Sequence, residues 1–232
     1  MFTWDGPLPE PQVRLAEDLR SVLADRTCTA NGPVYFMYRD LARSIADRDW
    51  LREQHLRYDV TVIPPAVLCG EYVKTKGHYH PDNPSGTGYP EIYEIIEGSA
   101  EYLLQDKALS DAVVVSAGKG DTVLIPPGYG HVTINPGKNV LVMANIVSTE
   151  FSSIYEDYED LRGAVFYRVE GKDYEKNSRY TTHLQLRHIR RCNDTGFPGI
   201  HNRSLYSIIG EENSLRFLNY PEEFIFDSVL QG

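Results

Sequence analysis

The sequence is poor in cysteine, and its few cysteines are widely spaced. The 232 residues include three, Cys28, Cys69 and Cys192, and no two of them form a C-x-x-C pair. An odd number at such separations is typical of neither a disulfide framework nor a zinc knuckle. We therefore expect a protein of the reducing cytoplasm.

Positive charge is also scarce. The chain has 23 Lys and Arg against 33 Asp and Glu, a formal net charge of −10. Nucleic acids and anionic membranes bind through clustered cationic excess, so we expect neither as a partner. Any anionic substrate must find a local positive site.

Long hydrophobic runs and targeting features are missing as well. No uncharged apolar run approaches the length of about 20 residues that spans a bilayer. The first twelve residues, MFTWDGPLPEPQ, lack the basic and apolar regions of a signal peptide. We expect neither membrane insertion nor secretion.

What remains is an ordinary globular composition, 41% hydrophobic and 24% charged. Over residues 13–26, apolar side chains recur at a spacing that predicts a helix. A strand is predicted over 33–40, a short helix over 41–51 and an extended stretch over 58–68. The apolar positions of the first helix are Leu15, Leu19, Val22 and Leu23.

From Glu71 to Ser148 the sequence is a succession of short β-type runs separated by turn residues. Strands at roughly 8 to 12 residue spacing indicate an all-β sandwich or barrel. No helical crossovers are predicted, which excludes a doubly wound sheet. We predict three parts: an N-terminal helical flank (1–32), a β-barrel core (33–155) and a mixed C-terminal elaboration packed on the barrel (156–232), with a basic stretch at 186–191.

One group of residues has the side-chain types of a metal site. His78 and His80 are two apart, so on a strand both face the same side, and Glu91 and Tyr93 share a face of a second strand. His131 opens a third strand. Three imidazoles and a carboxylate suit one divalent transition metal, Fe, Mn, Ni, Co or Zn, and differ from the oxygen ligands of calcium.

These residues resemble the two motifs of the cupin superfamily. The second motif, G-x5-P-x-G-x2-H-x3-N, is met in full by Gly120, Pro126, Gly128, His131 and Asn135. The first, G-x5-H-x-H-x3,4-E-x6-G, is met by His78, His80, Glu91 and Gly98. The resemblance implies a cupin barrel, a double-stranded β-helix of jelly-roll type.

The first motif departs from the usual pattern in two places. Ten residues, PDNPSGTGYP, separate His80 from Glu91 where three or four are usual, and Tyr72 replaces the leading glycine. A stretch rich in Pro and Gly predicts a loop, which leaves the strands undisturbed. The E-x6-G interval selects Glu91 over Glu94, and we expect Glu94 and Glu97 to face solvent.

Within the superfamily, residues 33–155 resemble the cupin-type glucose-6-phosphate isomerase family, through T-K-G-H-x-H, E-x-Y and P-P-G-x-x-H-x-T-x-N. The resemblance implies a metal-dependent homodimer that interconverts glucose 6-phosphate and fructose 6-phosphate in glycolysis and gluconeogenesis. Carried over by position, the metal ligands are His78, His80, Glu91 and His131, the catalytic residues are Glu91 and Tyr93, and the sugar-phosphate contacts are Tyr35, Thr61, Thr75, Gly77 and Tyr155.

Two further expectations concern the edges of this site. On a regular strand Lys76 points away from Thr75, so we give it little weight as a phosphate ligand. Members of the family carry an aromatic residue or histidine after the last barrel strand, where this chain has Val147 and Ser153.

The chemistry itself stays open between two routes. Glu91 is the natural base for an enediol route, in which the metal polarises the carbonyl, and the same ligands also allow a hydride shift. The same metal site also suits another metal-dependent cupin enzyme, such as a dioxygenase or a different sugar isomerase, or a sugar-binding cupin without catalysis.

Overall fold

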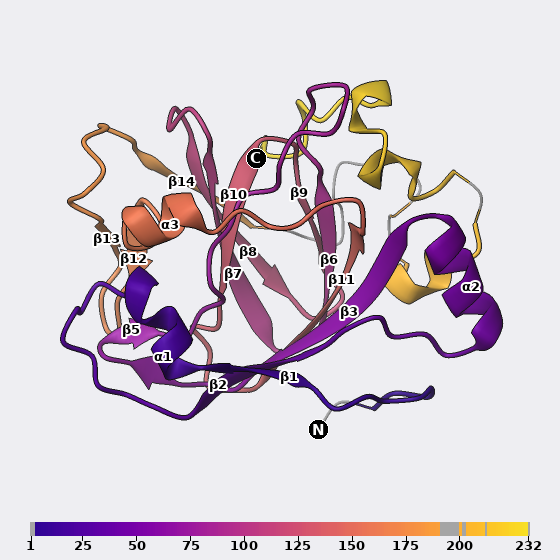
Figure 1. Cartoon of the computed structure of the whole chain (residues 1–232). Helices are drawn as coiled ribbons and strands as arrows, with labels where there is room; N and C mark the ends of the chain where they lie inside the picture. Colours follow the sequence, from indigo (N-terminus) through magenta and orange to yellow (C-terminus); the bar gives the residue numbers. More distant parts are fainter. Residues whose placement is uncertain (1–2, 191–199, 201–202, 212, 232) are drawn as a thin grey trace.

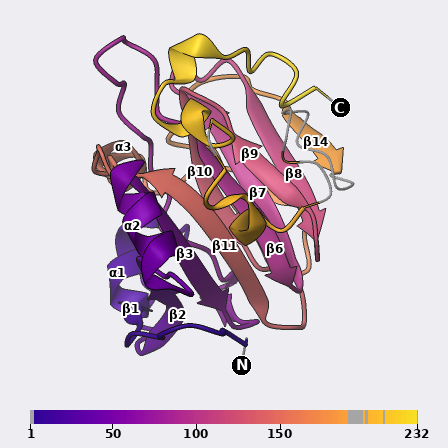
Figure 2. The ribbon, with the colours of Figure 1, turned by 90° about the vertical axis from the view of Figure 1, so that its right-hand side faces the viewer.

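The computed structural model describes residues 3–190, 200, 203–211 and 213–231, and two β-sheets that face each other dominate it (Figures 1 and 2). The six-stranded sheet contains, in spatial order, β1 (Gln12–Leu15), β2 (Pro33–Tyr38), β3 (Leu56–Ile63), β11 (Leu141–Ser148), β6 (Glu91–Glu97) and β9 (Thr122–Ile125). The four-stranded sheet contains β10 (Tyr129–Ile134), β7 (Ser99–Asp106), β8 (Ala112–Gly118) and β14 (Leu186–Arg190).

Smaller elements surround the two sheets. Two short hairpins pair β4 (Val67–Leu68) with β5 (Glu71–Tyr72) and β12 (Phe166–Arg168) with β13 (Tyr174–Lys176). The α-helices are α1 (Ala16–Leu19), α2 (Ile45–Glu53) and α3 (Glu156–Asp160). Single 3₁₀ turns lie at Arg20–Val22, Leu205–Ile208, Arg216–Leu218 and Pro221–Glu223.

The order in which strands β6, β7, β9, β10 and β11 pair defines the barrel. In the six-stranded sheet β6 pairs with β11 on one side. On its other side β6 pairs with β9, and in the four-stranded sheet β7 pairs with β10, so strands three apart in sequence are neighbours. This is the jelly-roll pattern. Every residue of β11 is buried, as its continuous apolar run predicts for a strand covered on both faces. The predicted all-β cupin fold is confirmed.

The predicted loop between His80 and Glu91 is confirmed and is ordered by its own side chains. The Asn83 side-chain oxygen accepts hydrogen bonds from the backbone N–H groups of Ser85 and Thr87. The Asn83 amide donates to Glu222 at 2.7 Å, which ties the loop to the C-terminal part of the chain. The long insertion is therefore a structured connection.

The helix predicted over 13–26 is wrong at its start. Residues Gln12–Leu15 form β1, which pairs antiparallel with β2 and places Arg14 opposite Tyr35, and only α1 and one 3₁₀ turn follow. Hydrogen bonds along the free edge of β2 outweigh the helical pattern of the segment. The predicted apolar stripe is nevertheless buried at Leu19, Val22 and Leu23. The boundaries at residues 32 and 155 stay a prediction.

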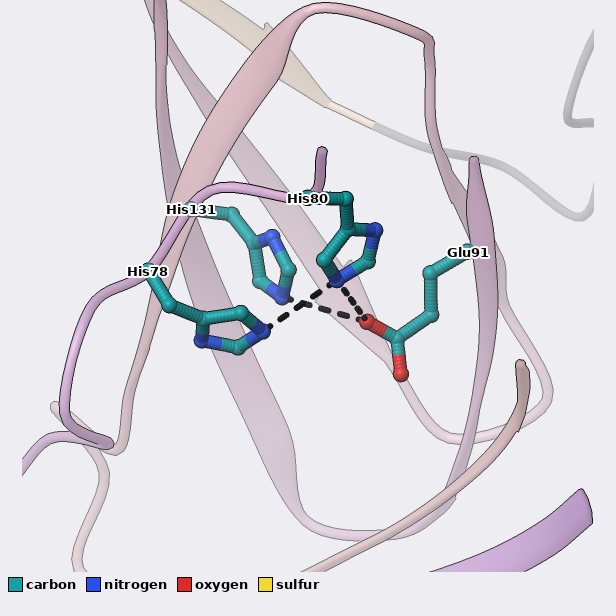
Figure 3. Close-up of side chains that lie close together, drawn as sticks. All are labelled: His78, His80, Glu91 and His131. Atoms are coloured by element: carbon teal, nitrogen blue, oxygen red, sulfur yellow. Dashed lines mark hydrogen bonds and ion pairs between the residues drawn. The ribbon is translucent and has the colours of Figure 1, made fainter. Parts of the chain in front are cut away.

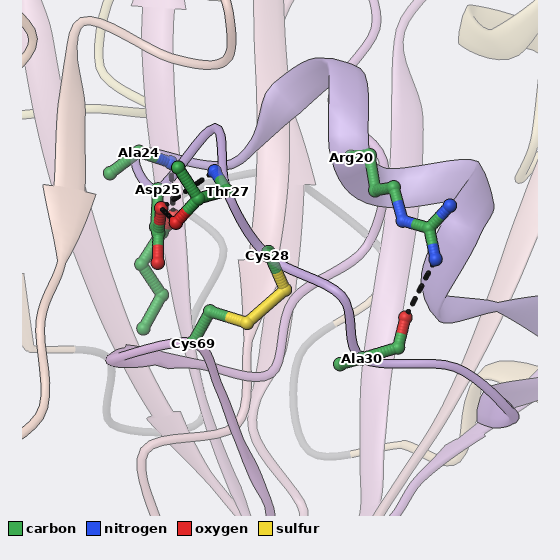
Figure 4. Close-up of a disulfide and its surroundings, with 8 residues drawn as sticks. Arg20, Ala24, Asp25, Thr27, Cys28, Ala30 and Cys69 are labelled. Atoms are coloured by element: carbon green, nitrogen blue, oxygen red, sulfur yellow. Dashed lines mark hydrogen bonds between the residues drawn. A yellow bond between two sulfur atoms is a disulfide. The ribbon is translucent and has the colours of Figure 1, made fainter.

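The expectation that the cysteines form no disulfide is wrong for two of them. Cys28 and Cys69 are bonded, with Cα atoms 5.7 Å apart (Figure 4). The two residues are 41 positions apart, and only the folded path, which brings the turn between β4 and β5 beside the segment after α1, joins them. The pairing removes the basis on which a reducing compartment was inferred. Cys192 lies outside the described residues.

The C-terminal part contacts the barrel through one strand, and its predicted boundaries stay a prediction. The basic stretch forms β14, which pairs parallel with β8, and its last residue, Arg191, lies outside the described residues. The prediction that Glu94 is solvated is wrong, because this side chain is half-buried and accepts a hydrogen bond from the Leu205 N–H at 2.7 Å. In the part of the chain that the structure describes, no helix combines the length and the apolar character needed to span a bilayer.

Candidate metal centre

Four side chains from three parts of the barrel converge at one point (Figure 3). Glu91 opens β6, His131 lies on β10, and His78 and His80 lie on the extended segment that forms a β-bridge to His131. Their ligand atoms all lie within 4.8 Å of one another. The structure therefore brings together the four residues that the sequence proposes as metal ligands.

The spacing of these atoms fits a metal ion. The Nε2 atoms of His78 and His80 are 3.3 Å apart, and Glu91 Oε2 lies 3.4 Å from Nε2 of both His80 and His131. Donors about 2.1 Å from one ion lie roughly 3.0–3.4 Å apart in octahedral or tetrahedral coordination. The three nitrogens and one oxygen are the donor set of a borderline transition metal.

Burial sets the protonation states that such an ion requires. Burial lowers the pKa of His131 and holds that of His78 well below its ordinary value, so both imidazoles are neutral. Burial would raise the pKa of Glu91, but the neighbouring His131 and His80 outweigh this effect and hold the pKa well below the usual range. His78 and His131 thus present neutral imidazoles, and Glu91 presents an ionised carboxylate.

Outer contacts orient the ligands. His80 Nδ1 lies 2.9 Å from the Tyr89 carbonyl oxygen, which fixes the proton on Nδ1 and leaves Nε2 as the ligand atom. The Asn145 side-chain amide donates to Glu91 Oε1 at 2.7 Å and leaves Oε2 facing the imidazoles. Sequence reasoning missed Asn145, although the alternation of β11 places it on the inner face. His131 Nδ1 is buried without a partner among the described residues.

A cavity of about 510 Å³ opens beside the four ligands. It is lined by most of the residues proposed as catalytic or substrate contacts, namely Tyr35, Thr61, Thr75, Tyr93 and Tyr155. The Tyr93 hydroxyl lies 3.0 Å from His131 Nε2. Burial raises the pKa of Tyr35 and raises that of Tyr93 well above its ordinary value, so both phenols stay protonated.

Gly77 is placed differently from the other predicted contacts. It is buried and is not among the lining residues of the cavity. A Cβ at this position would lie 2.4 Å from the ring of Tyr158 and 2.7 Å from Val132, so only glycine fits. Packing against Tyr158 explains the residue type, and the predicted substrate contact of Gly77 stays a prediction.

Lys76 is expected to point away from Thr75, yet both residues line the cavity. Lys76 lines the cavity, its Nζ lies 5.4 Å from the centre of the Tyr155 ring, and its ammonium is paired with Glu159. The chain after β5 joins its neighbours by isolated bridges rather than a regular ladder, so the alternation of a strand does not hold there.

Sequence reasoning also missed three arginines that line the cavity, Arg14, Arg39 and Arg57. Arg39 Nη1 and Arg57 Nε both bind Oδ2 of Asp59, at 2.6 and 2.8 Å, and Asp59 is fully buried. The alternation of β3 puts Arg57, Asp59 and Thr61 on one face, so the strand pattern together with Thr61 could have predicted that Arg57 faces the cavity. The position of Arg14 at the cavity was missed because its segment is predicted as a helix.

An aromatic residue closes the metal end of the cavity. Phe151 lines the cavity, and its ring lies 4.4 Å from the His80 ring and stacks on Tyr89 at 4.8 Å between centroids. The sequence comparison placed the family's closing residue at Val147 or Ser153, both of which also line the cavity. Phe151 supplies the aromatic wall from a neighbouring position.

The jelly-roll barrel and its inward His-His-Glu-His cluster define a cupin with a candidate metal site. The chain belongs to the glucose-6-phosphate isomerase family, whose model matches residues 13–185. It is 29% identical over 120 residues to glucose-6-phosphate isomerase of Thermococcus kodakarensis, across 51% of this chain and 58% of that protein. It is 34% identical over 86 residues to the enzyme of Thermococcus litoralis, across 37% and 43%.

These alignments span about half the length of the relatives. Among solved structures, the chain is similar to the oxalate decarboxylase of Lactobacillus farciminis. That match has a TM-score of 0.40 and 18% identity, and it covers 53% of this chain and 31% of the other. A similarity at this level adds nothing to the assignment.

Proposed function

We propose that the protein is a metal-dependent aldose–ketose isomerase that interconverts glucose 6-phosphate and fructose 6-phosphate. One observation carries the proposal: the four-residue cluster opens into a cavity that is also lined by hydroxyl-bearing and cationic side chains. Thr61, Thr75 and Tyr35 line that cavity beside Glu91. The cavity therefore suits a polyhydroxyl chain with a reactive end at the cluster and an anionic end away from it.

A divalent transition metal, Fe, Mn, Ni, Co or Zn, held by His78, His80, Glu91 and His131 would supply a Lewis acid that polarises the substrate carbonyl. On the enediol route Glu91 takes the proton from C2 of the open-chain aldose while the carbonyl oxygen at C1 gains a proton. The O2 hydroxyl then gives up its proton, and a proton that has exchanged with solvent on Glu91 goes to C1, so that the reaction is a net isomerisation. Asn145 holds the other oxygen of this carboxylate at 2.7 Å and keeps it oriented.

Tyr93 and the aromatic wall complete the site. The Tyr93 phenol stays protonated and lines the cavity, with its hydroxyl 3.0 Å from His131 Nε2. When a metal ion holds that nitrogen, the hydroxyl is left as a hydrogen-bond donor for a substrate oxygen. Phe151 and Tyr155 line the cavity beside His80 and His78, where their rings would limit access of water to the reacting carbons. Turnover of C2-deuterated glucose 6-phosphate in water separates the routes, because proton transfer releases deuterium to solvent and a hydride shift retains it.

The finer assignments belong to the same proposal. A role in glycolysis and gluconeogenesis follows from the substrate pair. A cytoplasmic location follows from the charge of the substrate, since a phosphate dianion does not cross a bilayer unaided. The Cys28–Cys69 disulfide indicates that this compartment is not strongly reducing. A homodimer is proposed from the family, and a monomeric mass by light scattering contradicts it.

The direct test is to load the purified chain with each candidate metal and to follow glucose 6-phosphate formed from fructose 6-phosphate. His131→Ala is expected to lose bound metal and activity together, while His183→Ala, an exposed histidine, keeps both. Absence of turnover with every metal contradicts the isomerase. Sugar-phosphate binding that persists in a protein without turnover favours the non-catalytic cupin.

A further inference from the structure

The cavity is lined by four cationic side chains, and three of them are already paired. Arg39 and Arg57 share the buried carboxylate of Asp59. Lys76 is paired with Glu159. Two carboxylates thus offset two of these three positive charges, and each of the three side chains already has an anionic partner within the protein.

Arg14 differs from the other three. Among the described residues it forms no ion pair, and its Nε atom is buried without a hydrogen-bond partner. A guanidinium cannot be deprotonated in a protein, so Arg14 keeps its charge. A charged donor buried without a partner costs free energy unless an acceptor is supplied. The missing acceptor is expected to arrive with a ligand.

The position of Arg14 indicates which part of a ligand it meets. Its partner across the β1–β2 ladder is Tyr35, and the guanidinium carbon lies 6.0 Å from the Tyr35 ring centre. The Tyr35 hydroxyl accepts a hydrogen bond from the Lys76 N–H at 3.2 Å, next to Thr75. Arg14 therefore belongs to the hydroxyl-bearing end of the cavity.

We propose that Arg14 provides the positive charge that binds the phosphate of the sugar-phosphate substrate. The proposal deepens the isomerase assignment and rests on it. A guanidinium presents several donors in one plane, which suits phosphate oxygens, and the dianion supplies the acceptor that Nε lacks. Arg14 is thus a substrate-binding residue that selects phosphorylated sugars over free sugars, and it takes no part in proton transfer.

The test compares Arg14→Gln and Arg14→Lys with Arg26→Gln, an exposed arginine of the same N-terminal segment. Binding of glucitol 6-phosphate, which has no carbonyl to react, and of glucitol is measured by calorimetry on the metal-loaded protein. Arg14→Gln is expected to weaken glucitol 6-phosphate binding about 10–100-fold and to leave glucitol binding unchanged. Arg14→Lys is expected to restore part of the affinity, and Arg26→Gln to match the parent.

Two results overturn the role of Arg14: equal affinity of Arg14→Gln and the parent for glucitol 6-phosphate, or an equal loss for both ligands, which marks a structural effect. Kinetics separate this inference from the isomerase. If the parent isomerises fructose 6-phosphate and Arg14→Gln keeps its KM, the isomerase stands and the inference fails. If glucitol 6-phosphate binds through Arg14 but the parent shows no turnover, the inference stands and the isomerase fails.

Discussion

The cavity has two chemically different regions. We call the four candidate ligands, His78, His80, Glu91 and His131, the metal end, and the three arginines, Arg14, Arg39 and Arg57, the arginine side. In the metal end His80, Glu91 and His131 are buried and His78 is half-buried, and burial lowers the pKa values of His78 and His131. The arginines are only partly buried and keep their charge at every accessible pH.

The difference separates reaction from binding. Three imidazoles and one carboxylate are arranged to hold a cation and to move a proton, and by themselves they bring no positive charge for a phosphate. The arginine side has no group that accepts a proton at carbon, but it supplies charge. Changes at the metal end should therefore act on kcat and metal content, and changes on the arginine side should act on KM.

The largest effect is expected for Glu91→Gln. This change keeps the shape of the side chain and removes both the anionic ligand and the base, so kcat is expected to fall by about 10²–10⁴-fold and metal affinity to fall with it. Steady-state kinetics and metal analysis measure both. Glu97→Gln, an exposed position on the same strand, is the matched control and should leave both unchanged. A Glu91→Gln enzyme with parental kcat would contradict the claim that the metal end controls kcat and the arginine side controls KM.

The next effect concerns the Cys28–Cys69 disulfide, which ties the segment after β1 to the turn after β4. Replacing both cysteines by serine opens a loop of about 40 residues, and the chain-entropy estimate is a loss of about 2–4 kcal/mol in the free energy of unfolding. Because the tether lies beyond the strand that carries Arg14, KM should rise while metal content stays the same.

Urea unfolding with and without reductant measures the effect of the disulfide. The parent should lose stability in reductant, and the double serine variant should not respond to it. Loss of bound metal in that variant, at unchanged KM, would show that the disulfide supports the metal end instead.

The two regions also differ in how far the sequence predicts them. The metal end consists of residues fixed by motif spacing on regular strands, so strand alternation places His131 and Glu91 on the inner face. The arginine side depends on pairings that spacing does not encode. Arg14 faces the cavity only because its segment joins β2 as an edge strand, although its local pattern is helical. Lys76 lies on an irregular segment, where alternation fails.

A smaller effect on kcat is expected for Asn145→Ala. This change removes the hydrogen bond to Glu91 Oε1 and frees the carboxylate to rotate, which should lower kcat or metal affinity about 10–100-fold. KM measured with excess metal should change little, because Asn145 belongs with the metal end. Asn139→Ala, an exposed residue outside the cavity, is the control. A rise in KM alone would place Asn145 with the arginine side.

The smallest effect is the pH dependence of folding stability in the metal-free protein. The folded pKa values of His78 and His131 lie below their unfolded value of about 6.5, so the unfolded chain binds more protons as the pH falls. Stability is therefore full above about pH 6.5 and decreases below it, by up to about 1.4 kcal/mol per pH unit for each histidine. The ionised Glu91 stabilises the fold throughout this range. Because its pKa is lowered from 4.5, that stabilisation is lost only at pH values below about 4.5.

Urea unfolding in chelator at pH 7.5 and 5.5 measures this slope. His78→Gln should reduce the slope, because one of the two titrating groups is gone. Arg57→Gln changes the arginine side, which does not titrate in this range, and should leave the slope as in the parent. The opposite result, a slope that follows Arg57 and ignores His78, would mean that the proton-sensitive part of the cavity is not the metal end.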